Sequence, residues 1–108
     1  MKRSLVFIFF FAAVLSTTWA SAQESKNTAK TGKALFDSSC MSCHGVRGEG
    51  IGNFPKLAGM AADAFTAKIR DYRAGKQMGT QTAVMAPNAK KLSDDQISSL
   101  AAYVAGLK

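Results

Sequence analysis

The hydrophobic pattern of this chain opens with one long apolar run. Lys2 and Arg3 precede an uninterrupted apolar stretch from Leu5 to Leu15, and small residues follow at Ala20-Ser21-Ala22. A positive start, an apolar middle and a small-x-small end are the features of a secretory signal peptide. We therefore predict a signal peptide over residues 1–22, cleaved after Ala22. An uncleaved membrane anchor is the alternative, but this apolar run spans only about 16 Å as a helix, roughly half of the hydrocarbon core.

After this segment the apolar positions recur at helical spacing, and strand patterns are almost absent. Residues 23–30 are polar and have no apolar period, which predicts a flexible leader. A first helix is expected to start near Thr31, as its cap, and to run to about Met41. A second helix is expected from about Asp63 to Ala74, with Gly75 as its stop.

The last helix has the clearest pattern. Ser93 and Gln96 form a capping box, and Asp94 and Asp95 favour the positive end of the helix dipole. The helix then shows one apolar stripe, formed by Ile97, Leu100, Ala101, Val104 and Leu107. A glycine-rich stretch from residue 45 to 55 and an extended segment from 76 to 92 are predicted to be loops. This pattern predicts an all-α domain of three or four short helices and long loops, and such long loops need an organising centre.

The composition leaves too little bulk for an ordinary core. The chain has 108 residues, which is the size of one small domain. It is 47% hydrophobic, but its only tryptophan and four of its seven phenylalanines lie in the predicted signal peptide. A domain this small with so few bulky side chains would be marginal on its own core. Something else is therefore expected to fill the interior.

The charge of the chain restricts its partners. The 14 basic and 7 acidic side chains give a formal net charge of +7. Without Lys2 and Arg3 of the predicted signal peptide the charge is +5, and this balance suits docking to acidic protein surfaces or anionic lipid heads. The basic residues are scattered singly, apart from Lys90-Lys91, and few aromatic residues lie among them. Nucleic-acid binding is therefore not expected.

Both cysteines and the only histidine lie together in Cys40-Met41-Ser42-Cys43-His44. A zinc site would need a fourth ligand, and no further cysteine or histidine exists to supply it. A redox-active cysteine pair would be typical of a strand-and-helix fold, which the pattern does not predict. We favour covalent haem attachment, because two cysteines three apart can meet the two vinyl groups while the adjacent histidine faces the iron. A buried porphyrin would also supply the missing apolar bulk.

With this motif and the segments that follow it, the chain resembles the class I c-type cytochromes, in particular the short exported bacterial ones. The matching segments run in order along most of the chain after residue 22: Gly32 and Phe36, Cys40-x-x-Cys43-His44-Gly45-x-x-Gly48-x-Gly50, Pro55-x-Leu57-Ala58-Gly59, Tyr72-Arg73-x-Gly75, Met85-x-Pro87 and Leu92-Ser93-Asp94-Asp95-x-Ile97 with Leu100-Ala101-x-Tyr103. The resemblance implies a cytochrome c domain over residues 23–108, wrapped around one covalent haem c. It also implies a periplasmic location.

The second axial ligand is expected to be a methionine, because His44 is the only imidazole. Met41 sits between the two attachment points, and Met60 opens the second predicted helix, where packing is its usual role. Met78 and Met85 both lie in the segment that could cross the opposite haem face. The resemblance places the ligand just before the second proline and the last helix, which favours Met85.

The resemblance also implies a partner for the ring of His44. A ligating histidine usually donates its other ring proton to a carbonyl or a carboxylate, which fixes the orientation of the ring. In the family this acceptor is the carbonyl of the proline after the glycine loop, which corresponds to Pro55. An ordinary turn residue is the alternative for Pro55.

These residues predict a function in electron transfer. A haem iron held by His44 and Met85 has no open position for a substrate, which leaves one-electron transfer through the exposed haem edge. We therefore expect a carrier without catalytic residues, which shuttles electrons between respiratory or dehydrogenase partners that have acidic docking surfaces, with transient contact to a membrane complex. Two alternatives stay open. One is a haem c subunit of a larger periplasmic oxidoreductase, and the other is a five-coordinate haem that binds gas or peroxide.

Overall fold

The computed structural model describes residues 20–108, with the side chains from Lys30 onward, and most of the predicted signal peptide lies outside this part of the chain. Within it the structure has five helices and no strand, and one isolated bridge pairs Ile51 with Phe54. The helices are α1 (Ala20–Ser39), α2 (Met41–His44), α3 (Ala62–Arg73), α4 (Thr82–Lys90) and α5 (Asp94–Gly106). The expected all-α class is confirmed. None of the described helices is both long enough and apolar enough to cross a membrane.

The first helix differs from its prediction at both ends. Residues 23–30, expected to be a flexible leader, belong to α1, and Thr31 lies inside this helix instead of capping it. Alanine, glutamine, glutamate and lysine are good helix formers, and neither glycine nor proline interrupts residues 20–31. The missing apolar period therefore did not exclude a helix. At its other end α1 stops at Ser39, and Cys40 forms a turn before α2.

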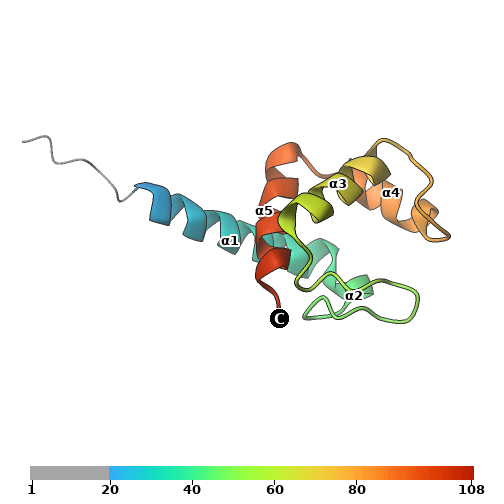
Figure 1. Ribbon diagram of the computed structural model, residues 1–108, viewed down its shortest axis with the longest axis horizontal. Coiled ribbons are helices and arrows are strands. Elements are labelled where there is room, and N and C mark those ends of the chain that lie inside the picture. Colours follow the sequence, from blue (N-terminus) through green and yellow to red (C-terminus); the bar gives the residue numbers. More distant parts are fainter. Residues whose placement is uncertain (1–19) are drawn as a thin grey trace, which may run out of the picture.

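The two terminal helices cross and build one half of the core (Figure 1). Gly32 lies at the crossing, directly against the backbone of Ser99 in α5. One turn further along α1, the ring of Phe36 is fully buried and packs on Tyr103, with 5.4 Å between the ring centroids. From α5, the stripe predicted for this helix supplies the other buried side chains, namely Ile97, Leu100, Ala101 and Val104.

The ends of α3 and α5 follow their local signals. After α3 the chain turns at Gly75, whose φ is +80°, and the N–H groups of Gly75 and Lys76 bond to the carbonyls of Tyr72 and Asp71. This pattern is a Schellman motif, so the predicted stop is confirmed. At the start of α5 both hydrogen bonds of the predicted capping box, between Ser93 and Gln96, are present.

The prediction of an extended loop over residues 76–92 is wrong, because Thr82–Lys90 form α4. Its apolar residues stand side by side in sequence and show no helical period, and Pro87 lies inside the helix. The proline removes the N–H group that would bond to the carbonyl of Ala83. Packing compensates for this loss, because Ala89 is fully buried and α4 lies against α3. Tertiary contacts therefore make a helix where the local pattern predicts none.

Candidate functional site

The end of α1 and the single turn of α2 bring the two cysteines and the histidine together. The backbone stays helical through this region, because the N–H of Cys40 bonds to the carbonyl of Phe36 at 2.9 Å and that of His44 to the carbonyl of Cys40 at 2.9 Å. Cys40 is buried, Cys43 is partly buried, and no disulfide joins the two. Both thiol side chains and the imidazole therefore project from adjacent turns around one place in the fold.

His44 is buried and has a fixed ring orientation. Its Nδ1 atom lies 2.8 Å from the carbonyl oxygen of Pro55. A carbonyl oxygen only accepts hydrogen bonds, so Nδ1 carries the proton and donates it. In the neutral ring the proton on Nδ1 leaves Nε2 with a free lone pair, the form that binds a metal. The ring of Phe54 lies edge-on to the imidazole, with 6.1 Å between the centroids.

The glycine loop determines where the carbonyl of Pro55 lies. The N–H of Gly50 bonds back to the carbonyl of His44 at 2.7 Å, and the carbonyl of Gly48 accepts from the N–H groups of Leu57 and Ala58. Gly50 has a φ of +87°, and a Cβ at this position would lie 2.9 Å from the backbone nitrogen of Lys56. Only glycine tolerates both this backbone angle and this close approach. The loop therefore closes tightly over α2 and presents Pro55 to His44.

An apolar cleft lies beside these residues, with about 980 Å³ of space that includes the open solvent at its mouth. Its walls come from every helix and from the loop before α3. The lining residues are Ser39, Cys40, Cys43, His44, Phe54, Pro55, Leu57, Met60, Phe65, Lys68, Ile69, Tyr72, Gln81, Val84, Met85, Asn88, Leu92 and Leu100. The cleft thus brings together all five residues that the sequence nominated: Cys40, Cys43, His44, Pro55 and Met85.

Met60, Met78 and Met85 line two different hollows of the structure. Met85, on α4, and Met60, in the loop before α3, both line the large cleft and are partly buried. Met78 lines a neighbouring, more open hollow together with Tyr72 and Gln81. Sequence reasoning left Met60 out as a packing residue and kept Met78 as the alternative to Met85. The structure instead makes Met60 the other thioether in the cleft.

Sequence reasoning also missed the wall that α4 contributes. Val84, Met85 and Asn88 line the cleft from α4. Their spacing of one and four residues is typical of one helix face. That signal becomes visible only when residues 82–90 are taken as a helix.

The residues of the cleft fit a covalent porphyrin better than a redox-active thiol pair. Burial, and to a smaller extent the neighbouring Cys43, raises the pKa of the Cys40 thiol to about 11. A thiol with such a pKa is neutral at pH 7, whereas reactive redox cysteines have a lowered pKa. Two thiols, one imidazole with a free Nε2 and thioethers in an apolar cleft are the groups that attach and ligate a haem.

Comparisons with known proteins point the same way. A family model described as "Cytochrome c" matches residues 29–108. Cytochrome c-554(547) of Halothiobacillus neapolitanus is 40% identical over 88 residues, which cover 74% of this chain and 97% of that protein. A protein of Stutzerimonas stutzeri named "Thiosulfate dehydrogenase electron acceptor" is 35% identical over 69 residues, covering 63% of this chain and 32% of that protein.

A solved structure has the same fold. Reduced recombinant cytochrome c4 from Pseudomonas stutzeri superposes with a TM-score of 0.69 and 33% sequence identity. The match covers 77% of this chain and 50% of that chain. This chain therefore corresponds to about half of the cytochrome c4 chain.

Proposed function

Because this chain is a class I c-type cytochrome, an electron-transfer protein of a family that carries covalent haem c, we propose that it is a periplasmic one-electron carrier with a single haem. The observation that carries this proposal is the hydrogen bond between His44 Nδ1 and the carbonyl of Pro55. It leaves Nε2 as the free nitrogen of a buried imidazole in a cleft that also contains two thiols and Met85.

Four side chains would hold the haem. The Cys40 and Cys43 thiols would attach it as thioethers, while His44 Nε2 and the Met85 sulfur would ligate its iron. When bound, the haem supplies a one-electron couple. The hydrogen bond to Pro55 keeps the imidazole in one tautomer and one orientation, and it raises the basicity of Nε2.

The rest of the chain restricts what this site can do. With His44 and Met85 as its ligands, the iron would have no position left for a substrate. Apolar side chains such as Leu57, Ile69 and Leu100 exclude water from the interior of the cleft. A thioether ligand favours the reduced state and raises the potential. These properties suit a carrier and not an enzyme.

The partners are proposed from charge and from the names of relatives. Without Lys2 and Arg3 of the proposed signal peptide the formal net charge of +7 becomes +5, which favours partners with acidic docking surfaces. One relative is named as the electron acceptor of a thiosulfate dehydrogenase, so we propose dehydrogenases or respiratory complexes as the partner class. A rate of electron transfer that falls as ionic strength rises would support this assignment, because salt screens such encounters.

A haem c subunit of a larger oxidoreductase is the second candidate. It is favoured by the match to only 32% of the length of the Stutzerimonas protein, in which the corresponding region is part of a longer chain. Sizing the native protein from its host distinguishes the two candidates, because a free carrier elutes at the size of this chain alone.

Visible spectra of the mature protein in both redox states test the haem and its ligands. We expect a c-type haem spectrum, with a weak far-red band in the oxidised form that reports sulfur on the iron. Met85→Ala should remove this band and let carbon monoxide bind the reduced protein. Met60→Ala is the matched control from the same cleft and should keep the band. A colourless protein would overturn the haem assignment, and a band that survives in Met85→Ala would overturn the ligand.

Export is tested separately. We propose that residues 1–22 direct the chain to the periplasm and are removed after Ala22. The mass of the protein from the periplasmic fraction should therefore correspond to a chain that begins at Gln23 and carries one attached haem, whereas a retained first segment would indicate a membrane anchor.

A further inference from the structure

We propose that Arg73 is a positioning residue for Met85: its guanidinium fixes the junction between α4 and α5 to the end of α3, and this contact keeps α4 against the cleft. The inference rests on the proposed ligation by Met85. It adds a residue that does not line the cleft and that acts through the backbone of its neighbours.

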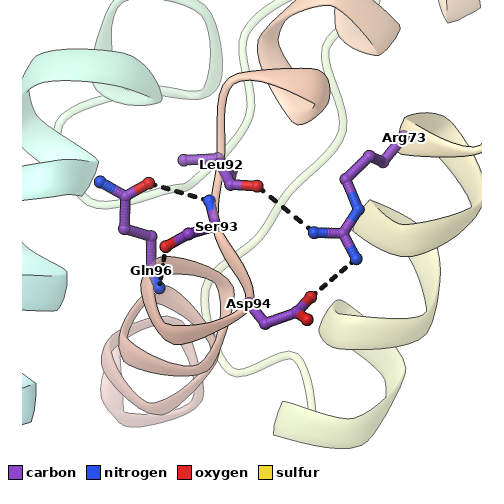
Figure 2. Close-up of polar contacts among 5 residues, drawn as sticks. All are labelled: Arg73, Leu92, Ser93, Asp94 and Gln96. Carbon is purple, nitrogen blue, oxygen red and sulfur yellow. Dashed lines mark hydrogen bonds and ion pairs between the residues drawn. The ribbon is translucent and has the colours of Figure 1, made fainter.

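Arg73 is the last residue of α3 and reaches both sides of the junction (Figure 2). One guanidinium nitrogen, Nη1, donates to the carbonyl oxygen of Leu92 at 3.3 Å, and the other, Nη2, donates to Oδ1 of Asp94 at 2.7 Å. Leu92 follows the end of α4 by two residues, and Asp94 is the first residue of α5. A single side chain thus joins the end of α3 both to the junction after α4 and to the first residue of α5.

The junction is held rigidly on its α5 side. The backbone N–H of Ser93 donates to Oε1 of Gln96 at 2.9 Å, and the Ser93 hydroxyl accepts from the N–H of Gln96 at 3.2 Å. Ile97 and Leu100, in the next turn of α5, are buried in the core. The position of Ser93 is therefore set by α5, and the hydrogen bond from Arg73 also holds the preceding residue, Leu92, in place.

Leu92 is in turn bonded to α4. The N–H of Leu92 bonds to the carbonyl of Ala89 at 3.2 Å, and the Leu92 side chain itself lines the cleft. Ala89, which is fully buried, lies one helical turn after Met85. A shift of the junction would therefore move the helix that carries Met85.

The sequence of helix α4 stabilises it little, so the helix depends on tertiary contacts such as this one. It has nine residues, contains Pro87, and leaves Val84 and Asn88 exposed. Helices this short are marginal without tertiary contacts. Arginine suits the task better than lysine, because its planar fork reaches two acceptors at once in a fixed geometry.

The pair is partly open to solvent, with side-chain exposures of 32% for Arg73 and 68% for Asp94. Pairs of this kind contribute little to global stability. Loss of Arg73 should therefore mainly raise the fraction of molecules in which α4 has moved away from the cleft. A ligand that competes with Met85 then binds with a higher apparent affinity.

The test titrates the oxidised holoprotein with imidazole, which competes with the Met85 sulfur. Imidazole binding is measured by the loss of the far-red band. For Arg73→Gln we expect the apparent Kd for imidazole to fall about two- to fivefold. Arg73→Lys, which keeps the charge but cannot reach both acceptors, should give an intermediate value. Asp94→Asn removes the negative charge that strengthens the second bond and should shift the Kd in the same direction, so the inference stays testable if Arg73→Gln does not fold.

Two controls separate positioning from general destabilisation. Lys76→Gln breaks the ion pair with Asp71 in the same region and should leave the Kd unchanged. Val104→Ala opens the core in α5 and should lower the unfolding midpoint in denaturant without tightening imidazole binding. Unchanged imidazole affinity in both Arg73→Gln and Asp94→Asn, or equal tightening in Val104→Ala, would overturn the inference alone. A wild-type protein without the far-red band would overturn the proposed ligand, and the inference with it.

Discussion

Gly32 permits the close crossing of α1 and α5, because a side chain at this position has no space. A Cβ there would overlap the carbonyl oxygen of Ser99 and would lie 2.8 Å from the Cβ of Tyr103. Both neighbours belong to the backbone or to the root of a side chain in α5, so neither can move without displacing that helix. A glycine is therefore needed at this position because the two helices pack so closely, and not because of its φ angle.

Gly32→Ala should reduce the free energy of unfolding by about 1–3 kcal/mol, the usual cost of forcing extra volume into a packed interior. Gly106→Ala is the matched control, because no atom lies within 4 Å of the position of its Cβ. In a helix this control should be neutral or stabilising by up to about 1 kcal/mol. Denaturant unfolding of the three proteins measures both effects, and equal stabilities for the two variants would contradict the account of the crossing.

Asp94 should make stability depend on pH. Its hydrogen bond to Arg73, supported by the charge of Arg73, lowers the pKa of this carboxyl below the ordinary value of 3.8. The folded protein therefore releases this proton more readily than the unfolded chain. The resulting stabilisation is present above pH 3.8 and is lost as the pH falls through the lower, folded-state pKa.

The prediction is that Asp94→Asn is less stable than the wild type at pH 7 and that this difference shrinks as the pH falls below about 4. Asp95→Asn removes the same charge from the first turn of α5 and serves as the control for the helix dipole. Unfolding by denaturant at several pH values provides the measurement. A difference that persists at pH 2 would show that the effect is not the ionisation of Asp94.

At the level of the helices, the start of α4 depends on one hydroxyl group. The buried Thr82 accepts from the N–H of Met78 at 2.8 Å and donates to the carbonyl of Gly79 at 2.7 Å. These bonds close the turn that leads into α4. They hold the N-terminal end of this helix, while the contact of Arg73 with Leu92 holds the chain that leaves its C-terminal end.

Thr82→Val, which keeps the shape but loses the hydroxyl, should reduce the free energy of unfolding by about 1–3 kcal/mol, because the N–H of Met78 loses its acceptor and the carbonyl of Gly79 loses one of its donors. Thr82→Ser keeps the hydroxyl and should retain most of the stability. Hydrogen exchange at the Met78 amide gives a local measurement. If that amide stays equally protected in the valine variant, the hydroxyl does not hold this turn.

The sequence predicted the helices that carry their own signals and missed those that depend on contacts. Helix α5 has its cap and its stripe in consecutive residues, so its start and its buried face could be predicted. Helix α4 has neither, since its apolar residues are adjacent and Pro87 argues against a helix. The site was predictable where chemistry is local, as in the segment from Cys40 to His44. The wall formed by α4 was not, because it arises from packing between segments distant in sequence.

For the whole molecule, the cleft replaces part of the core that the side chains do not fill. Among the side chains that the structure describes, the large ones that are fully buried are Phe36, Ile97, Leu100 and Val104, all on α1 and α5. The second half of the described fold, from α2 to α4, packs around the cleft instead. A haem bound there would therefore contribute a large share of the apolar contacts of this half.

A Cys40→Ser, Cys43→Ser double variant, which cannot attach haem, should keep some helix but lose cooperative unfolding. The reason is that a chain of this size is marginal without the additional buried surface. Far-UV and near-UV circular dichroism, together with denaturant unfolding, give the measurement. A variant that unfolds as sharply and at the same midpoint as the haem-bound protein would show that the side chains alone suffice for folding.

The acceptor for His44 is a main-chain oxygen, and this has a genetic consequence. A single codon change cannot delete the carbonyl of residue 55, since every amino acid brings one. Only changes that redirect the path of the loop, such as a bulkier residue at Gly50, can remove the bond. Random mutagenesis should therefore find variants with a misdirected imidazole at the glycines of the loop more often than at position 55.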